Sequence, residues 1–273
     1  MKIYISIDLE GIPGIVSQDH VKKDGKDYEK ARKWMTNHLN TVIESLKETG
    51  VQKILVNDSH GEMTNIILDE IPEDVEIITG NLKKFSMVEG INECDAGIFL
   101  GYHSKAGSLG VLDHTYFGRA IYEIRINKIP YGEFGINTLV AGNFDVPIIF
   151  VSGDDETIKE AKSLVENIEY VLTKQRRSRF SAKTFSFKSI EREIRNKIPI
   201  AIKKFKNKEI LPLKLTGSIE IEVDFINTAM ADIGEIMPKT IRTSPRTLYY
   251  KAEDIIEAYF VLRTWITLAG SVI

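Results

Sequence analysis

The sequence predicts an α/β fold: a mostly parallel sheet flanked by helices in an N-terminal domain, followed by a smaller α+β subdomain. Three observations support this. Short β-branched or wholly apolar runs recur through the first half of the chain, as expected for strands buried on both faces. Amphipathic helical patterns lie between these runs. Near residue 174 the pattern changes, and a strictly alternating strand follows later.

The first two strands can be placed with a helix between them. Ile3, Ile5 and Ile7 form a β-branched run at the start of the chain. Residues 27–49 carry apolar side chains at three- and four-residue spacing, and Gly50 is a typical helix stop. Residues 52–56 then form a second strand. This βαβ unit predicts parallel strands that end at the same edge of the sheet.

The same alternation continues to about residue 167. The sequence predicts strands at 75–79, 96–100 and 146–151, a helical stretch around 86–91, a hairpin within 120–132, and helices over 133–142 and 156–167. Each of these assignments depends on the local sequence pattern alone, because the sequence does not show which elements pack together.

We expect residues 1–173 to form a metal-binding catalytic domain, and 174–273 a supporting α+β subdomain that could carry oligomer contacts. The basic stretch 174–179 could be a linker, an anion clamp or a subunit contact. A helix is predicted over 187–206, with Pro199 expected to kink or split it. Residues 218–225 alternate as a half-exposed strand, and 252–269 form a closing helix.

Composition limits the classes of function. The 273 residues have a net charge of −3, which gives little support to nucleic-acid binding. No apolar run approaches the roughly 20 residues that span a membrane, and the first residues do not read as a signal peptide. The single cysteine, Cys94, cannot form an intrachain disulfide, so we expect a cytoplasmic location. Acidic neighbours should keep the Cys94 thiol inert.

The first strand leads into two acids, Asp8 and Glu10. If the strand continues through them, their side chains point to the same face, about 6.5 Å apart along the chain. Two buried carboxylates so placed need a proton or a cation, and a divalent metal accepts both. A short acidic motif alone is more often a loop cap with a solvated neighbour.

Histidines follow the next strands at the same predicted edge. Asp58 and His60 follow the second strand, and His103 follows 96–100. Together with the two acids they form a set of nitrogen and oxygen ligands typical of zinc. Asp58 either orients His60 or caps a loop. Glu133, in the first turn of a helix, is by itself a helix-dipole partner more often than a ligand.

The remaining histidines are read from their surroundings. His20 lies in a polar loop and His38 among polar neighbours on the helix over 27–49, so we expect both at the surface. His114 lies in a glycine-rich loop shortly after His103.

Six segments, taken in order, resemble the zinc-dependent D-aminopeptidase family, peptidase family M55. The resemblance covers the first 155 residues well and the rest more loosely. Each segment alone is a weak signal, but their common order is specific. The segments are residues 6–11, 56–60, 84–90, 99–103, 132–137 and 151–155.

The resemblance implies two zinc ions per chain and a preference for short peptides with an N-terminal D-amino acid, D-Ala in type. The resemblance further implies that Asp8 bridges the two metals and that the other ligands are Glu10, His60, His103 and Glu133. The catalytic histidine falls on His114, which would pass a proton to the leaving amine or stabilise the oxyanion. Residues 112–116 depart from the more Ser- and Met-containing family pattern. The resemblance also implies a ring-like homodecamer.

Two other classes of function remain open from the sequence. One is a different metal-dependent hydrolase, an amidase or a phosphoesterase. A phosphate would need basic or glycine-rich partners, for which Lys105, Gly107 and Gly110 offer a weak candidate. The other is a non-catalytic metal- or peptide-binding protein, which substitution of an acid or of His114 would have favoured.

Overall fold

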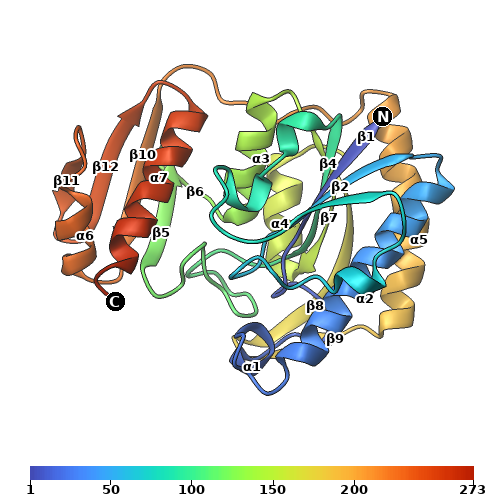
Figure 1. The fold of residues 1–273 in the computed structure, drawn as a ribbon. Coiled ribbons are helices and arrows are strands. Elements are labelled where there is room, and N and C mark those ends of the chain that lie inside the picture. Colours follow the sequence, from blue (N-terminus) through green and yellow to red (C-terminus); the bar gives the residue numbers. More distant parts are fainter.

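The computed structural model describes all 273 residues, arranged as a large and a small sheet with their helices (Figure 1). The large sheet has the strand order β3-β2-β1-β4-β7-β8-β9 and is parallel except for β9. This mixed, mostly parallel architecture confirms the predicted fold class. Its strands are β1 (Lys2–Ile7), β2 (Lys53–Asp58), β3 (Val75–Ile78), β4 (Ala96–Tyr102), β7 (Ile148–Asp154), β8 (Glu169–Ser178) and β9 (Ser181–Thr184).

Strand β1 lies at the topological switch point of this sheet. It pairs in parallel with β2 on one side and with β4 on the other. The chain runs outward from β1 through β2 to β3 and then returns to start β4 on the opposite side. Ligands of open α/β sheets bind beyond the carboxyl ends of strands at such a point.

Helices cover both faces of the large sheet (Figure 1). Helices α2 and α5 pack together on one face, while α3 and α4 pack together on the other. The α-helices of this layer are α1 (Gln18–Val21), α2 (Tyr28–Glu48), α3 (Glu133–Asn143), α4 (Asp155–Leu164) and α5 (Phe187–Lys206). Short 3-10 turns are η1 (Leu68–Glu70), η2 (Ser86–Val88) and η3 (Ile91–Glu93). None of the helices is both long and apolar enough to cross a membrane.

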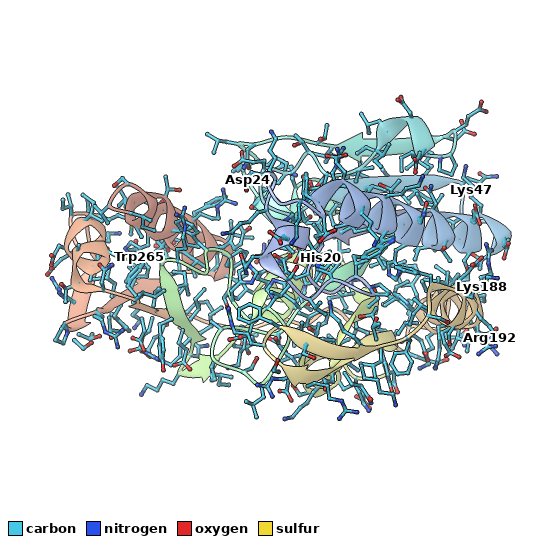
Figure 2. The ribbon with its side chains drawn as sticks, turned by 90° about the horizontal axis from the view of Figure 1, so that it is seen from below. His20, Asp24, Lys47, Lys188, Arg192 and Trp265 are labelled. Carbon is cyan, nitrogen blue, oxygen red and sulfur yellow. The ribbon has the colours of Figure 1, made fainter.

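The small sheet is antiparallel, with the order β11-β12-β10-β5-β6. Helices α6 and α7 pack on it, and Trp265 of α7 lies within this smaller lobe (Figure 2). Its elements are β5 (Ile121–Ile126), β6 (Ile129–Pro130), β10 (Ile219–Phe225), α6 (Thr228–Gly234), β11 (Ile241–Ser244), β12 (Thr247–Ala252) and α7 (Ile255–Gly270).

The division of the chain between the two sheets differs from a single cut at residue 173, which falls inside β8. Strands β5 and β6 join the small sheet, whereas β9 and α5 belong to the large layer. The reason is long-range pairing, since Ile126 of β5 lies opposite Ile221 of β10. Local sequence patterns do not show which strand pairs with which.

Two local predictions differ from the structure in part. Pro199 does not split its helix, because α5 is one helix from Phe187 to Lys206. A proline removes a single intrahelical hydrogen bond, and α5 compensates by burying an apolar stripe that includes Ile194 and Ile198. The helical stretch around 86–91 is instead two 3-10 turns, because Gly90 between them has a left-handed backbone, with φ of 84°.

His38 is buried, not at the surface as the sequence suggested, with 4% of its area exposed. Its Nε2 lies 2.9 Å from Ser152 Oγ, and Ser152 Oγ accepts a hydrogen bond from the backbone nitrogen of Gly101. His20 is half-buried and contacts Ser17 and Trp34. The apolar environment lowers the pKa of His38 to about 4, since burial disfavours the charged imidazole.

The folded protein therefore prefers neutral His38, and stability should fall as the pH drops from about 6.5 towards 4. Between pH 7 and pH 5 we expect the wild type to lose about 2 kcal/mol more of its unfolding free energy than His38→Gln. Glutamine keeps an acceptor for Ser152 but has no charge to gain. Urea unfolding at fixed protein concentration tests this, and equal losses in both proteins would contradict it.

Lys174 is fully buried, and it is neither a linker nor a surface clamp. Its Nζ donates hydrogen bonds to the backbone carbonyls of Glu10, Ile12 and Ile15. Burial lowers its pKa to about 8. The lysine thus ties β8 to the turn that follows β1. At the other end of the basic stretch, Arg179 pairs with Asp113 of its own chain, at 2.7 Å.

Candidate metal centre

Asp8 and Glu10 lie in a tight turn at the carboxyl end of β1. The strand ends at Ile7, so the turn and not strand alternation brings both carboxylates to one place. The backbone nitrogen of Asp8 still donates to Leu100 of β4, at 2.8 Å. Gly11 is needed next because a Cβ there would lie 2.0 Å from the carbonyl oxygen of Tyr102. Both acids are nearly inaccessible, with 2% and 5% of their areas exposed.

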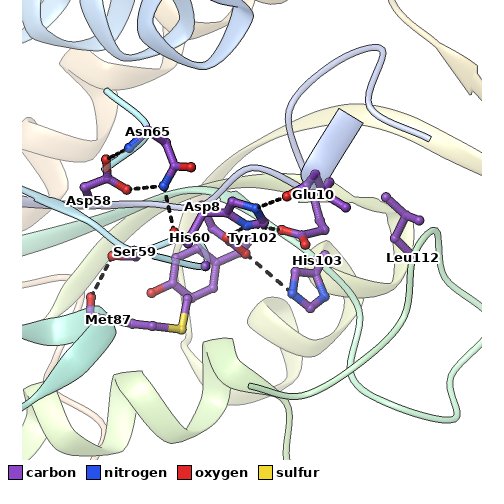
Figure 3. A network of polar contacts seen from close by, with 12 residues as sticks. Asp8, Glu10, Asp58, Ser59, His60, Asn65, Met87, Tyr102, His103 and Leu112 are labelled. Atoms are coloured by element: carbon purple, nitrogen blue, oxygen red, sulfur yellow. Dashed lines mark hydrogen bonds and ion pairs between the residues drawn. The ribbon is translucent and has the colours of Figure 1, made fainter. Parts of the chain in front are cut away.

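His60 and His103 each direct one ring nitrogen at these acids (Figure 3). His60 Nδ1 lies 2.9 Å from Glu10 Oε2 and 3.2 Å from Asp8 Oδ1. His103 Nε2 lies 3.4 Å from Asp8 Oδ2 and 3.4 Å from Glu133 Oε1. The two histidines therefore face different oxygens of Asp8.

A backbone carbonyl fixes the tautomer of each imidazole. His60 Nε2 donates to the carbonyl of Val21 at 2.8 Å, and His103 Nδ1 donates to that of Ser104 at 3.0 Å. In the neutral form of each ring, the nitrogen that faces the acids is therefore the one that can bind a metal. Without a metal it carries a proton, because burial opposes the charged imidazole but the neighbouring carboxylates outweigh burial and raise the pKa of both histidines well above the usual value. A histidine ligand held by a hydrogen bond from its other nitrogen is the usual arrangement at protein metal sites.

Glu133 and His114 complete the cluster from a third side. Glu133 is the first residue of α3, and its Oε1 accepts a hydrogen bond from the backbone nitrogen of Tyr116, at 2.6 Å. His114 Nδ1 donates to Leu112 at 2.9 Å, and its Nε2 lies 4.0 Å from Glu133 Oε1. The rings of His103 and His114 stack 4.1 Å apart. All six residues singled out in the sequence thus come together.

The charges in this cluster require a cation or a proton. Burial, then repulsion from Glu10, raises the pKa of Asp8 to about 7. Burial also opposes ionisation of Glu10, but His60 outweighs it and holds the pKa of Glu10 well below its usual range. Burial lowers the pKa of His114, and the charge of His103 lowers it further.

The donor atoms fit a metal ion. Asp8 Oδ2, Glu10 Oε2 and His103 Nε2 are buried without a hydrogen-bond partner, which is costly unless something else binds them. Ligands at about 2.0–2.2 Å from a tetrahedral zinc ion lie about 3.4 Å from one another. The separations of 2.9–3.4 Å around Asp8 match this spacing, whereas His114 at 4.0 Å is farther out.

A cavity of about 330 Å³ lies over the cluster. Asp8, Glu10, His60, His114 and Glu133 line it, together with side chains of η2 and α7. His103 is not exposed to the cavity and lies stacked behind His114. Lys105, Gly107 and Gly110, the residues considered for a phosphate, do not line this cavity either.

Asp58 caps a loop, one of the two alternatives left by the sequence. Its carboxylate accepts hydrogen bonds from the backbone nitrogens of Asn65 and Ile66, at 2.5 and 2.8 Å. It reaches His60 only through Asn65, whose amide bonds both Asp58 Oδ1 and the His60 carbonyl at 2.7 Å (Figure 3).

Sequence reasoning missed the polar residues behind the site. Tyr116 Oη donates to Asn137 at 2.8 Å, and Asn137 donates to Tyr102 Oη at 3.1 Å. Tyr102 Oη in turn bonds Ser6 Oγ at 2.8 Å. These hydrogen bonds connect the loop that contains His114 with Ser6 in strand β1. Tyrosine and asparagine are common, so nothing in the sequence marked them out.

Comparison with known proteins agrees with this geometry. A family model described as D-aminopeptidase, peptidase family M55, matches residues 1–264. A D-aminopeptidase of Bacillus subtilis (strain 168) is 36% identical over 273 residues, covering 98% of each chain. A solved structure, the zinc-dependent D-aminopeptidase DppA from Bacillus subtilis, described as a self-compartmentalizing protease, superposes with a TM-score of 0.94. It is 34% identical, with 99% of this chain and 98% of that chain covered. The chain therefore belongs to the D-aminopeptidase family, peptidase family M55.

Proposed function

We propose that the protein is a zinc-dependent D-aminopeptidase that uses two zinc ions to hydrolyse short peptides with an N-terminal D-amino acid such as D-Ala. Family membership supports the activity. The observation that carries the metal centre is the set of buried carboxylates faced by imidazoles whose tautomers are fixed by backbone carbonyls. Such an arrangement is costly for a fold that binds no cation.

Asp8 is suited to bridge the two ions, because its two oxygens face different partners. Oδ1 lies towards His60, which also faces Glu10. Oδ2 lies towards His103, which also faces Glu133. We therefore assign Asp8, Glu10 and His60 to one ion, and Asp8, His103 and Glu133 to the other.

When bound, the two zinc ions would polarise the scissile carbonyl and lower the pKa of the attacking water. His114 lies farther from Glu133, at 4.0 Å, than the proposed ligands lie from one another, and it lines the cavity, so we assign its Nε2 to the substrate and not to a zinc ion. This nitrogen would take a proton from the attacking water and pass it to the leaving amine as the C–N bond breaks. The bond from Nδ1 to Leu112 holds the ring in position for this transfer.

We further propose a cytoplasmic homo-oligomer, with a ring-like decamer as the expected form. The similar solved structure is described as a self-compartmentalizing protease, which supports association of the chains. The cytoplasmic location is proposed because the single cysteine, Cys94, is free and forms no disulfide. Cys94 is also buried, which raises the pKa of its thiol to about 12. The mass of the particle in solution, measured by light scattering, tests the assembly: a monomer would contradict it.

Release of free alanine from D-Ala-D-Ala and from L-Ala-L-Ala, with zinc-loaded protein, tests the function. We expect cleavage of the D-peptide and a preference over the L-peptide of at least about a hundredfold in kcat/KM. Two zinc ions per chain are expected in the same preparation. Cleavage of neither peptide would contradict the proposal and favour an amidase, a phosphoesterase or a binding protein. Equal cleavage of both would contradict the stereochemical part.

A further inference from the structure

Arg263 is an unpaired cation in the cavity of the metal centre. It lies on α7 and lines the same cavity as Asp8, Glu10 and Glu133. Other arginines of the chain, such as Arg125 and Arg242, are held by carboxylates. The guanidinium of Arg263 forms no ion pair, although it is half-buried. Its guanidinium lies beside the Tyr259 phenol but has no carboxylate partner, so it can bind the carboxylate of a ligand.

The guanidinium of Arg263 lies beside the phenol of Tyr259. Burial raises the pKa of Tyr259 to about 12, and the charge of Arg263 opposes that rise, so the two groups are close. Tyr259 Oη donates to the carbonyl of Phe85 at 2.9 Å, which fixes the phenol against η2. Helix α7 packs against α3, the helix that begins with Glu133. The cavity thus carries acids and imidazoles on the large layer and a cation on the small lobe.

This distribution of charge matches a short zwitterionic peptide. We propose that Arg263 binds the terminal carboxylate of the substrate and so makes the enzyme selective for di- and tripeptides with a free C-terminus. The inference rests on the proposed peptidase function. A guanidinium binds a carboxylate through two parallel hydrogen bonds, which gives both strength and orientation. A volume of about 330 Å³ is at the small end for ligand sites and suits a peptide of this length.

A neighbouring cavity offers a competing set of cations. Lys22, Lys23 and Arg119 line it, and Arg119 lies over the ring of Phe117 at 5.3 Å. Of the six residues of the metal centre, only His60 reaches that cavity. A peptide whose scissile bond lies at the acids therefore has Arg263 within the same cavity, and Arg119 in the next one.

Arg119→Met is a matched control for Arg263→Met, because each removes one arginine charge and keeps an apolar stem. The experiment measures kcat/KM of wild type and both variants, all zinc-loaded, on D-Ala-D-Ala and on D-Ala-D-alaninamide. The amide has the same scissile bond but no terminal carboxylate. We expect the wild type to prefer the acid by roughly 10- to 100-fold. Arg263→Met should lose this preference through KM and keep its rate on the amide.

Each result separates the inference from the proposed function. If wild type cleaves both substrates equally well, or Arg263→Met keeps the preference, the function stands and the inference is wrong. If Arg119→Met loses the preference instead, the carboxylate lies in the other cavity and the inference is wrong. Cleavage of neither substrate would overturn both. Arg263→Lys keeps the charge but not the planar guanidinium that forms two parallel hydrogen bonds. It should retain part of the preference for the acid, and it serves as a second variant in case Arg263→Met does not fold.

Discussion

Asp8→Ala is expected to remove both zinc ions and to lower kcat/KM by at least about a thousandfold. The reason is geometric, since Asp8 is the one residue whose two oxygens face both histidine–carboxylate pairs. Glu10→Ala should instead leave one ion, because Glu10 faces His60 but not Glu133. Zinc content by elemental analysis, together with peptide cleavage, distinguishes the two variants.

Glu169→Gln provides the control for removal of a buried acid elsewhere. Glu169 is buried at the start of β8 and pairs with Lys197 and Lys204, away from the centre. This variant should keep its zinc and its activity. An Asp8→Ala protein that keeps two ions would contradict the bridging role, and one that keeps a single ion would place Asp8 in one site only.

Metal-free protein offers a second readout of the same residue. Because burial and Glu10 raise the pKa of Asp8 above its unfolded value, ionised Asp8 destabilises the metal-free fold as the pH rises through 7. Metal-free Asp8→Asn should therefore melt at a higher temperature than metal-free wild type at pH 8. Zinc should reverse the order, since only the wild type gains binding energy from both ions.

The edge of the sheet that carries the site was predictable because it depends on local signals. Asp8, His60 and His103 each follow shortly after a short apolar strand. A helical crossover makes these strands parallel, so the three residues lie at the same edge of the sheet. The way in which the two acids come together was not predicted. Strand β1 stops at Ile7, and a turn after it brings the side chains of Asp8 and Glu10 to one place. Gly11 after the acids was the available signal for that turn.

Residues that reach the site through tertiary packing could not be predicted in this way. Glu133 enters because α3 packs on β4, and only the family resemblance pointed to it. Arg263 arrives from the small lobe, whose sheet is built by pairing strands about a hundred residues apart, such as β5 and β10. The carbonyls that fix the imidazole tautomers have no signature, because every residue has one.

His38 is a case in which the signal was present but overlooked. It lies three residues after Met35 and four before Val42, both buried, and so on the inward face of α2. Polar neighbours in sequence suggested exposure, but on a helix residues three and four apart are the ones that share a face. Periodicity therefore predicted burial where residue type did not.

His114→Ala is expected to keep both zinc ions and to lose roughly 10²- to 10⁴-fold in kcat. Its Nε2 lies 4.0 Å from Glu133, outside the spacing of the proposed ligands, yet it lines the cavity where the leaving amine would lie. KM should change little, because the proton transfer is made in the transition state and not on binding. Zinc content and steady-state kinetics on D-Ala-D-Ala measure both effects.

His103→Ala is the matched comparison, because the two imidazoles stack 4.1 Å apart and differ only in which atoms they face. His103 Nε2 lies between Asp8 and Glu133, so its loss should remove one ion as well as activity. If His114→Ala loses zinc in the same way, His114 is a ligand, in a set with His103 and Glu133 whose donor atoms lie within 4.8 Å of one another. The proton would then have to be carried by another group, and Tyr116, whose side chain also lines the cavity, would be the next residue to test.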